Sequence, residues 1–159
     1  MKCRDEIKID TIRSMNTREA SGCERLLRSL PDWFGIESAI VRYRQDIEQQ
    51  DTYVAVGGKT IFGFITLKYH NAFSAEILVM AVEKANHRCG IGSSLMNVAE
   101  YKAKESNIQF LQVKTLGASH PDIHYKSTRA FYFNQGFRPL EENQLWGKTH
   151  PCLIMVKAL

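Results

Sequence analysis

Several features are missing from this sequence, and each absence disfavours a class of protein. No run approaches the roughly 18 apolar residues that a membrane span needs. The first ten residues are mostly polar and carry no apolar core, so we expect neither a signal peptide nor a transit peptide. No block of lysines and arginines is present, which argues against a nucleic-acid surface. No internal repeat is visible, so the fold must be inferred from periodicity.

Cysteine is sparse and scattered. The four residues, Cys3, Cys23, Cys89 and Cys152, form no C-x-x-C pair, so we expect reduced thiols, a cytoplasmic protein and no metal site. A length of 159 residues predicts one domain over residues 1–159. The net charge of +4 suits a small phosphorylated ligand, and we expect no nucleic-acid or membrane partner.

Hydrophobic periodicity predicts alternating strands and helices. Asn16 and Glu19 resemble a capping box before an apolar helical stripe that Pro31 ends. Asp122 and Gly136 mark the ends of the last helix. The expected helices begin near residues 16, 36, 91 and 122, and the expected strands are 6–10, 52–56, 60–69, 74–82, 110–116, 137–142 and 151–159. This order predicts a mixed α/β fold built on a central sheet.

A glycine-containing stretch, "NHRCGIGSS" at residues 86–94, lies where an apolar strand is expected to turn into a helix. Gly90 and Gly92 permit close approach of the backbone to a ligand, and a helix N-terminus attracts anions. His87 and Arg88 add positive potential, and Ser93 adds a hydroxyl. The stretch therefore indicates a phosphate site, while a glycine turn needed only for strand-to-helix packing stays an open alternative.

Two common phosphate motifs do not match these letters. A Walker loop needs a lysine directly after the second glycine, but Ser93 follows Gly92. A dinucleotide fingerprint needs a third glycine where the sequence has Leu95.

Further residues complete a different pattern. The motif H-x-x-G-x-G follows a strand ending in "MAV", and a later helix carries "FYFNQGF". This combination resembles the GNAT acetyltransferase superfamily, whose signature is Q/R-x-x-G-x-G/A followed by Y-x-x-x-G-F. The resemblance implies the acyl-CoA N-acyltransferase fold, with a mostly antiparallel sheet and about four helices. It also implies acetyl-CoA as the acyl donor.

The resemblance assigns cofactor contacts position by position. The backbone from about Arg88 to Ser93 would face the pyrophosphate of coenzyme A, and the strand backbone at two positions would pair with the pantetheine arm. His87 replaces the usual Gln or Arg, and Tyr125 stands where many members have Asn. The implied cofactor-binding residues are Met80, Val82, His87, Arg88, Cys89, Gly90, Ile91, Gly92 and Ser93.

Two residues are catalytic candidates. Tyr132, four residues before Gly136, matches the tyrosine that protonates the departing thiolate, and aromatic core packing is the alternative role of this residue. Glu76 lies where several members hold a catalytic glutamate, beside the apolar run "ILVMAV", and would serve as the general base. A salt-bridged or hydrated strand-end carboxylate is its alternative role.

These observations lead to one main hypothesis and two alternatives. The main hypothesis is an acetyl-CoA-dependent N-acetyltransferase that acts on a primary amine of a small molecule by direct transfer in a ternary complex. A non-catalytic acyl-CoA binding module would keep the glycine stretch without an acceptor. An enzyme acting on a protein or RNA amine is the other alternative. Dimers are common in the family, so a homodimer is possible.

Overall fold

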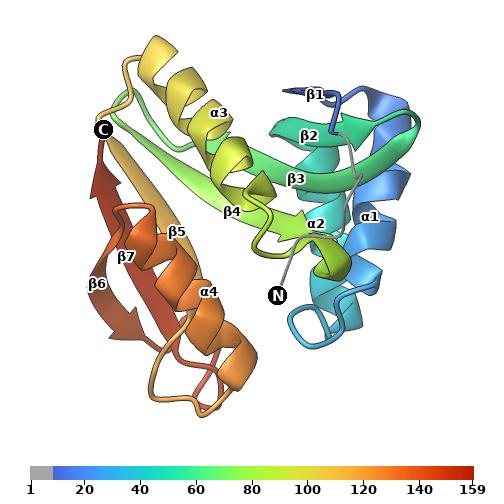
Figure 1. Cartoon of the computed structure of the whole chain (residues 1–159). Helices are drawn as coiled ribbons and strands as arrows, with labels where there is room; N and C mark the ends of the chain where they lie inside the picture. The colour runs from blue at the N-terminus through green and yellow to red at the C-terminus, as the bar shows by residue number, and fades with distance from the viewer. Residues whose placement is uncertain (1–8) are drawn as a thin grey trace. The chain divides into compact units, whose positions relative to one another are not determined.

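The computed structural model describes residues 9–159 (Figure 1). In this part of the chain lie four α-helices, α1 (Ala20–Arg28), α2 (Glu37–Gln49), α3 (Ile91–Glu105) and α4 (Ile123–Asn134). The strands there are β1 (Thr11–Ser14), β2 (Asp51–Gly57), β3 (Thr60–Tyr69), β4 (Ser74–Val82), β5 (Phe110–Leu116), β6 (Arg138–Asn143) and β7 (Cys152–Ala158). The predicted mixed α/β fold is confirmed. The strand expected at 6–10 falls mainly outside the described residues, and β1 starts only at Thr11.

The chain folds into two compact units. The first comprises the chain up to Lys68 together with Leu78–Lys102, and the second comprises Tyr69–Ile77 together with Ala103–Leu159. The described strands form one sheet in the order β1-β2-β3-β4-β5-β7-β6, with β4 continuing from one unit into the other. The expectation of a single domain over residues 1–159 stays a prediction.

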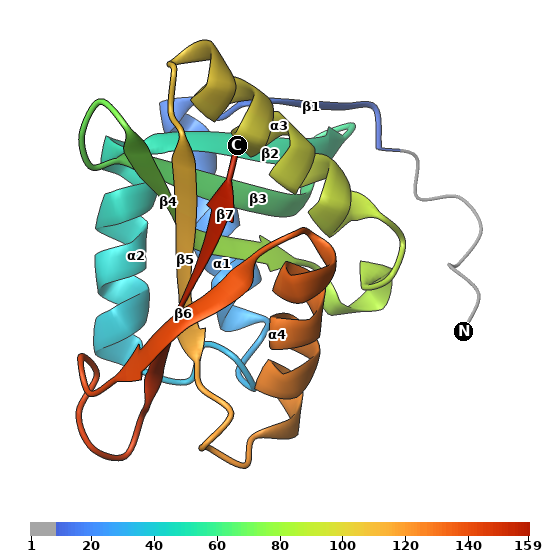
Figure 2. The same cartoon turned by 90° about the vertical axis from the view of Figure 1, so that its left-hand side faces the viewer.

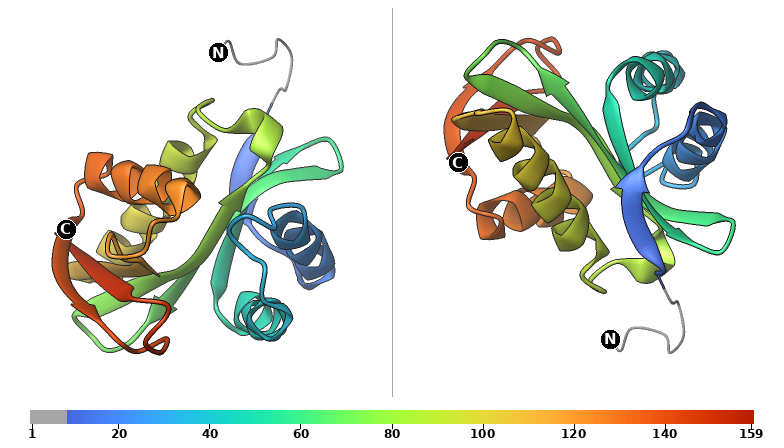
Figure 3. Two further views of the ribbon diagram at one scale, coloured as in Figure 1. Left: turned by 90° about the horizontal axis from the view of Figure 1, so that it is seen from below. Right: turned by 90° about the horizontal axis from the view of Figure 1, so that it is seen from above.

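The first unit contains an antiparallel β1-β2-β3 segment with helices on both faces (Figure 3). Helices α1 and α2 cover one face, and α3 begins on the other. The register between β2 and β3 shifts between Ala55 and Val56, a β-bulge that changes which β3 residues face the helices. Because of this shift, Ile61 and Phe64 both belong to the core cluster that includes Leu27 of α1.

Gly63 of β3 fixes how closely α3 approaches the sheet. A Cβ atom at this position would lie 3.1 Å from the Ala81 carbonyl oxygen, 3.1 Å from Leu95 Cδ1 and 3.2 Å from Ile91 Cγ2. The missing side chain therefore lets the first turns of α3 rest directly on β3. Helix α3 starts at Ile91, within the glycine stretch, so this contact also positions the stretch.

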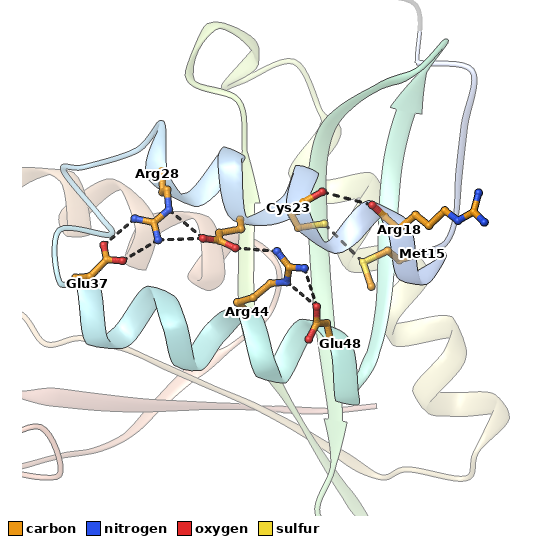
Figure 4. Close-up of polar contacts among 9 residues, drawn as sticks. Met15, Arg18, Cys23, Arg28, Glu37, Arg44 and Glu48 are labelled. Atoms are coloured by element: carbon orange, nitrogen blue, oxygen red, sulfur yellow. Dashed lines mark hydrogen bonds and ion pairs between the residues drawn. The ribbon is translucent and has the colours of Figure 1, made fainter.

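Helix α1 begins as its sequence predicts. The Asn16 side chain accepts a hydrogen bond from the backbone N–H of Arg18, and the Glu19 carboxylate accepts one from the Asn16 N–H, which completes the capping box. An ion-pair chain then links α1 to α2 (Figure 4). Its members, in order, are Glu37, Arg28, Glu24, Arg44 and Glu48.

The second unit is built around β5, β7 and β6, which pair antiparallel, while β5 pairs parallel with the start of β4 (Figure 2). Helix α4 packs against β5. Asp122 caps its N-terminus by accepting from the backbone N–H groups of His124 and Tyr125. At its C-terminus, Gly136 adopts φ 94° and the Phe137 N–H bonds to the Tyr132 carbonyl, as in a Schellman cap.

Candidate functional site

The glycine stretch connects β4 to α3, and hydrogen bonds fix the chain where the stretch begins. The Glu83 N–H donates to the Phe62 carbonyl at 2.9 Å, which ties the end of β4 to β3. Asn86 is buried, and its Nδ2 donates to Glu83 Oε2 at 2.6 Å. These bonds give the residues that follow a fixed starting point, because a buried amide held on its partner does not rotate freely.

The backbone of the stretch has the conformation that exposes N–H groups. Arg88 adopts φ 63° and Gly90 φ 83°, both in the left-handed region. A Cβ atom at Gly90 would meet nothing within 4 Å, so the space beside this residue is open. The Ser94 N–H already bonds to the Gly90 carbonyl, whereas Ile91 and Gly92 begin the helix, where an N–H group has no intrahelical acceptor.

This geometry suits an anion. Left-handed residues interspersed in a turn direct neighbouring N–H groups to one side, and the N-terminus of a 15-residue helix adds a positive partial charge. Arg88 is exposed, so its guanidinium is accessible to a negatively charged ligand. The fit of this turn to an anion depends on backbone N–H groups. It therefore does not require the Gln or Arg side chain that His87 replaces.

The His87 side chain turns back onto the protein. Its Nε2 lies 2.7 Å from the Val82 carbonyl oxygen, so the ring donates to that oxygen. The ring also meets Trp33 edge-on, with centroids 5.5 Å apart. Lys84 lies over the same Trp33 ring and pairs with Asp32 at 3.2 Å. His87 therefore joins the segment after α1 to the glycine stretch. Contact of its side chain with a phosphate stays a prediction.

Cys23 and Cys152 are free and buried, in agreement with the expectation of reduced thiols at these two positions. Of the residues predicted in the glycine stretch, Ile91 is buried in the core and Ser93 is half-buried. No group of three or more potential metal ligands occurs among residues 9–159.

Strand β4 changes its pairing along its length. Its register with β5 runs from Ser74↔Phe110 to Ile77↔Val113 and stops there. Met80 and Val82, both half-buried, lie beyond this point. The Val82 carbonyl accepts the hydrogen bond from His87, so one of the two predicted backbone positions already has a protein partner.

Glu76 is a buried carboxylate with two partners. Its Oε1 lies 2.8 Å from Lys114 Nζ and its Oε2 lies 2.6 Å from His70 Nε2. The Glu76 side chain is only 6% exposed. The alternative of a salt-bridged carboxylate is thus part of the observed arrangement, and a role as general base stays a prediction.

Sequence reasoning missed these two partners of Glu76. His70 precedes β4 across the β3–β4 hairpin, and Lys114 lies on β5, two residues beyond the register partner of Glu76, Gln112. Alternation places residues two apart on the same strand face, which is the signal that would have linked Lys114 to Glu76.

Tyr132 is buried in the second unit. Its ring packs against Phe131 and Phe137, with centroid distances of 5.4 and 5.8 Å. The Phe137 N–H also bonds to the Tyr132 carbonyl and completes the helix cap. The motif Y-x-x-x-G-F therefore corresponds to a helix C-terminus whose first and last residues pack against each other. The proposed acid role of the hydroxyl stays a prediction. Tyr125, at the position of the usual family Asn, lies in the first turn of α4.

The structure gathers the predicted residues into two groups. Those predicted to bind cofactor, from Met80 to Ser93, lie in the first unit, whereas Glu76 and Tyr132 lie in the second.

None of the helices in the described part of the chain is long and apolar enough to cross a membrane.

Solved structures share this fold at low sequence identity. The PaiA N-acetyltransferase from Thermoplasma acidophilum in complex with coenzyme A is 18% identical, with a TM-score of 0.75 over 94% of this chain and 98% of that one. A GNAT family acetyltransferase from Elizabethkingia anophelis with acetyl-CoA bound is 19% identical, with a TM-score of 0.70 over 94% and 97%. The ribosomal-protein-S18-alanine N-acetyltransferase from Escherichia coli is 14% identical, with a TM-score of 0.74 over 93% and 92%.

The sequence comparisons are more decisive about family. No curated protein matches the chain. The family model of the acetyltransferase (GNAT) domain matches residues 48–139, which include the glycine stretch, Glu76 and Tyr132. The predicted resemblance is therefore confirmed, and this chain belongs to the GNAT acetyltransferase family.

Proposed function

We propose that this protein is an acetyl-CoA-dependent N-acetyltransferase that transfers an acetyl group to a primary amine of a small molecule, by direct transfer in a ternary complex. The observation that carries the proposal is the turn between β4 and α3 in a chain of the GNAT family. There Arg88 and Gly90 are left-handed, the space beside Gly90 is open, and a long helix begins at Ile91.

Coenzyme A would be held mainly by backbone groups. The N–H groups around Gly90 and Gly92 bind the pyrophosphate, Arg88 adds charge, and Met80 supplies strand backbone to the pantetheine arm. The remaining members of the predicted set, Val82, His87, Cys89, Ile91 and Ser93, shape this turn. Relatives crystallised with coenzyme A or acetyl-CoA support the choice of ligand.

The acyl donor supplies a thioester whose carbonyl carbon bonds to the amine nitrogen as its bond to sulfur breaks. The chain must then do two things, because an ammonium ion cannot attack and a thiolate is a poorer leaving group than a thiol. A base near Glu76 removes the proton from the acceptor ammonium. The Tyr132 hydroxyl donates a proton to the departing sulfur.

Thiol release tests the activity directly. Purified protein is mixed with acetyl-CoA and a panel of polyamines, amino acids, aminoglycosides, peptides and RNA, and free thiol is followed over time. We expect acceptor-dependent release with at least one small amine. Release only with peptides or RNA would replace the small-molecule acceptor by a macromolecular one. Tight binding of coenzyme A without release for any acceptor would favour the non-catalytic module.

The Tyr132→Phe variant tests the proposed acid. It should lower turnover by about 10²-fold, in the range of a lost general acid, while the affinity for coenzyme A stays near that of the parent protein. The ring packing against Phe131 and Phe137 is retained, because only the hydroxyl is removed. Tyr101→Phe, at an exposed position of α3, is the matched control. Unchanged turnover would remove Tyr132 from the mechanism.

A further inference from the structure

The carboxylate of Glu76 is engaged on both oxygens, which limits what it can do directly. Lys114 Nζ donates to Oε1 at 2.8 Å and His70 Nε2 lies 2.6 Å from Oε2. The Lys114 ammonium and the Glu76 carboxylate form an ion pair. Each oxygen keeps a further lone pair, but the Glu76 side chain is only 6% exposed, so an incoming amine has little access to it.

Glu76 contacts only one of the two ring nitrogens of His70, which is Nε2. A carboxylate only accepts, so the nitrogen facing Glu76 is Nε2–H, and the neutral ring then carries its lone pair on Nδ1. The His70 side chain is 31% exposed, against 6% for Glu76. Of the two groups, His70 is therefore the one that a ligand in solution reaches.

The turn between β3 and β4 fixes the backbone that carries this ring. The His70 N–H donates to the Ser74 carbonyl at 3.0 Å. The Asn71 side-chain oxygen accepts from the backbone N–H groups of Phe73 and Ser74, at 2.8 and 3.0 Å. This Asx turn holds His70, which directly follows β3, opposite the start of β4 and beside the Glu76 carboxylate.

We propose that His70 is the base of the transfer reaction and that Glu76 is a positioning residue acting through it; this inference rests on the proposed function. The proton leaves the acceptor ammonium and binds His70 Nδ1, and the nitrogen keeps the electron pair that attacks the thioester. Glu76 orients the ring through Nε2–H and stabilises the imidazolium that forms. Glu76 from β4 contacts this ring, and Lys114 from β5 contacts the other oxygen of the same carboxylate.

The experiment compares H70Q, E76Q and the double variant, with kcat/KM measured across pH for the best acceptor found by thiol release. H70Q should lower kcat/KM by about 10²-fold or more and lack the acidic-side inflection that a histidine base would give the parent protein. E76Q should lose less activity and keep an acidic-side inflection, because His70 is still present in that variant. The double variant should equal H70Q, since the two residues act in series.

Controls separate this role from folding and from the proposed function. H150Q, which changes an exposed histidine of the β6–β7 loop, should keep the parent profile. Added imidazole should restore part of the activity of H70A, which a purely structural histidine would not allow. An H70Q profile like that of the parent, or an E76Q variant that alone loses the inflection, would overturn the inference. Absence of thiol release by the parent protein would instead overturn the proposed function.

Discussion

Charged side chains meet in two clusters that differ chiefly in burial. The first is the ion-pair chain between α1 and α2 in Figure 4, whose side chains are 26% to 67% exposed. The second is the carboxylate of Glu76 with Lys114 and His70, in which Glu76 is 6% exposed. Both have short distances, from 2.6 to 2.9 Å, so distance does not distinguish them.

Burial decides what each cluster contributes. A charge in the α1–α2 chain is solvated when its partner is removed, so the cost of the loss is small. The Glu76 carboxylate has little water to replace a lost partner, and an uncompensated buried charge is costly. The exposed cluster therefore adds modestly to stability, whereas removal of one partner from the buried cluster is expected to cost more. Three experiments test this difference.

The largest effect of burial is expected at Cys23, a buried thiol of α1. Burial raises the pKa of the Cys23 thiol from 9.0 to about 12, so about 1,000-fold less thiolate is present near neutral pH than for an ordinary thiol. Alkylation of Cys23 in the folded protein, followed by peptide mass spectrometry, should be slower by at least that factor. The same cysteine in urea is the control. Labelling at the rate of a small thiol would show that Cys23 is accessible.

The next effect tests the buried cluster itself. Lys114→Met should lower the free energy of unfolding by about 3 kcal/mol, because the buried Glu76 carboxylate loses its ammonium partner. Urea denaturation measures this loss, and Lys126→Met at an exposed position of α4 is the matched control. Combining Lys114→Met with Glu76→Gln should recover part of the stability. Equal stabilities of both lysine variants would show that burial does not set the value of this pair.

The smallest effect is expected in the exposed chain. The Arg28 and Arg44 guanidinium groups lower the pKa of the Glu24 carboxyl below its ordinary 4.5. The stabilisation is therefore complete above pH 4.5 and is lost as the pH falls through the lowered value. Glu24→Gln should change the urea midpoint at neutral pH far less than Lys114→Met, and high salt should shrink the difference. A loss as large as that of Lys114→Met would contradict the comparison.

The sequence predicted elements accurately where local signals repeat. The strand at Ser74–Val82, the strand at Phe110–Leu116 and the Asp122 cap agree with the structure, because apolar runs, caps and glycines act over a few residues. The expected strand at 6–10 lies mainly outside the described residues, and the observed β1 pairs with β2 from Thr11↔Val56. Strand boundaries of this kind depend on a partner distant in sequence.

For the candidate site, the sequence by itself determined the glycine stretch and the family, because Gly90, Gly92 and Tyr132 keep the family spacing. Only the tertiary structure decided which side chains the candidate residues meet. His87 bonds to Val82 across a turn, and Glu76 is joined by His70 through a hairpin and by Lys114 from β5. These partners are brought together by strand register and chain reversal, and side-chain hydrogen bonds across such distances leave no periodic signal in the sequence.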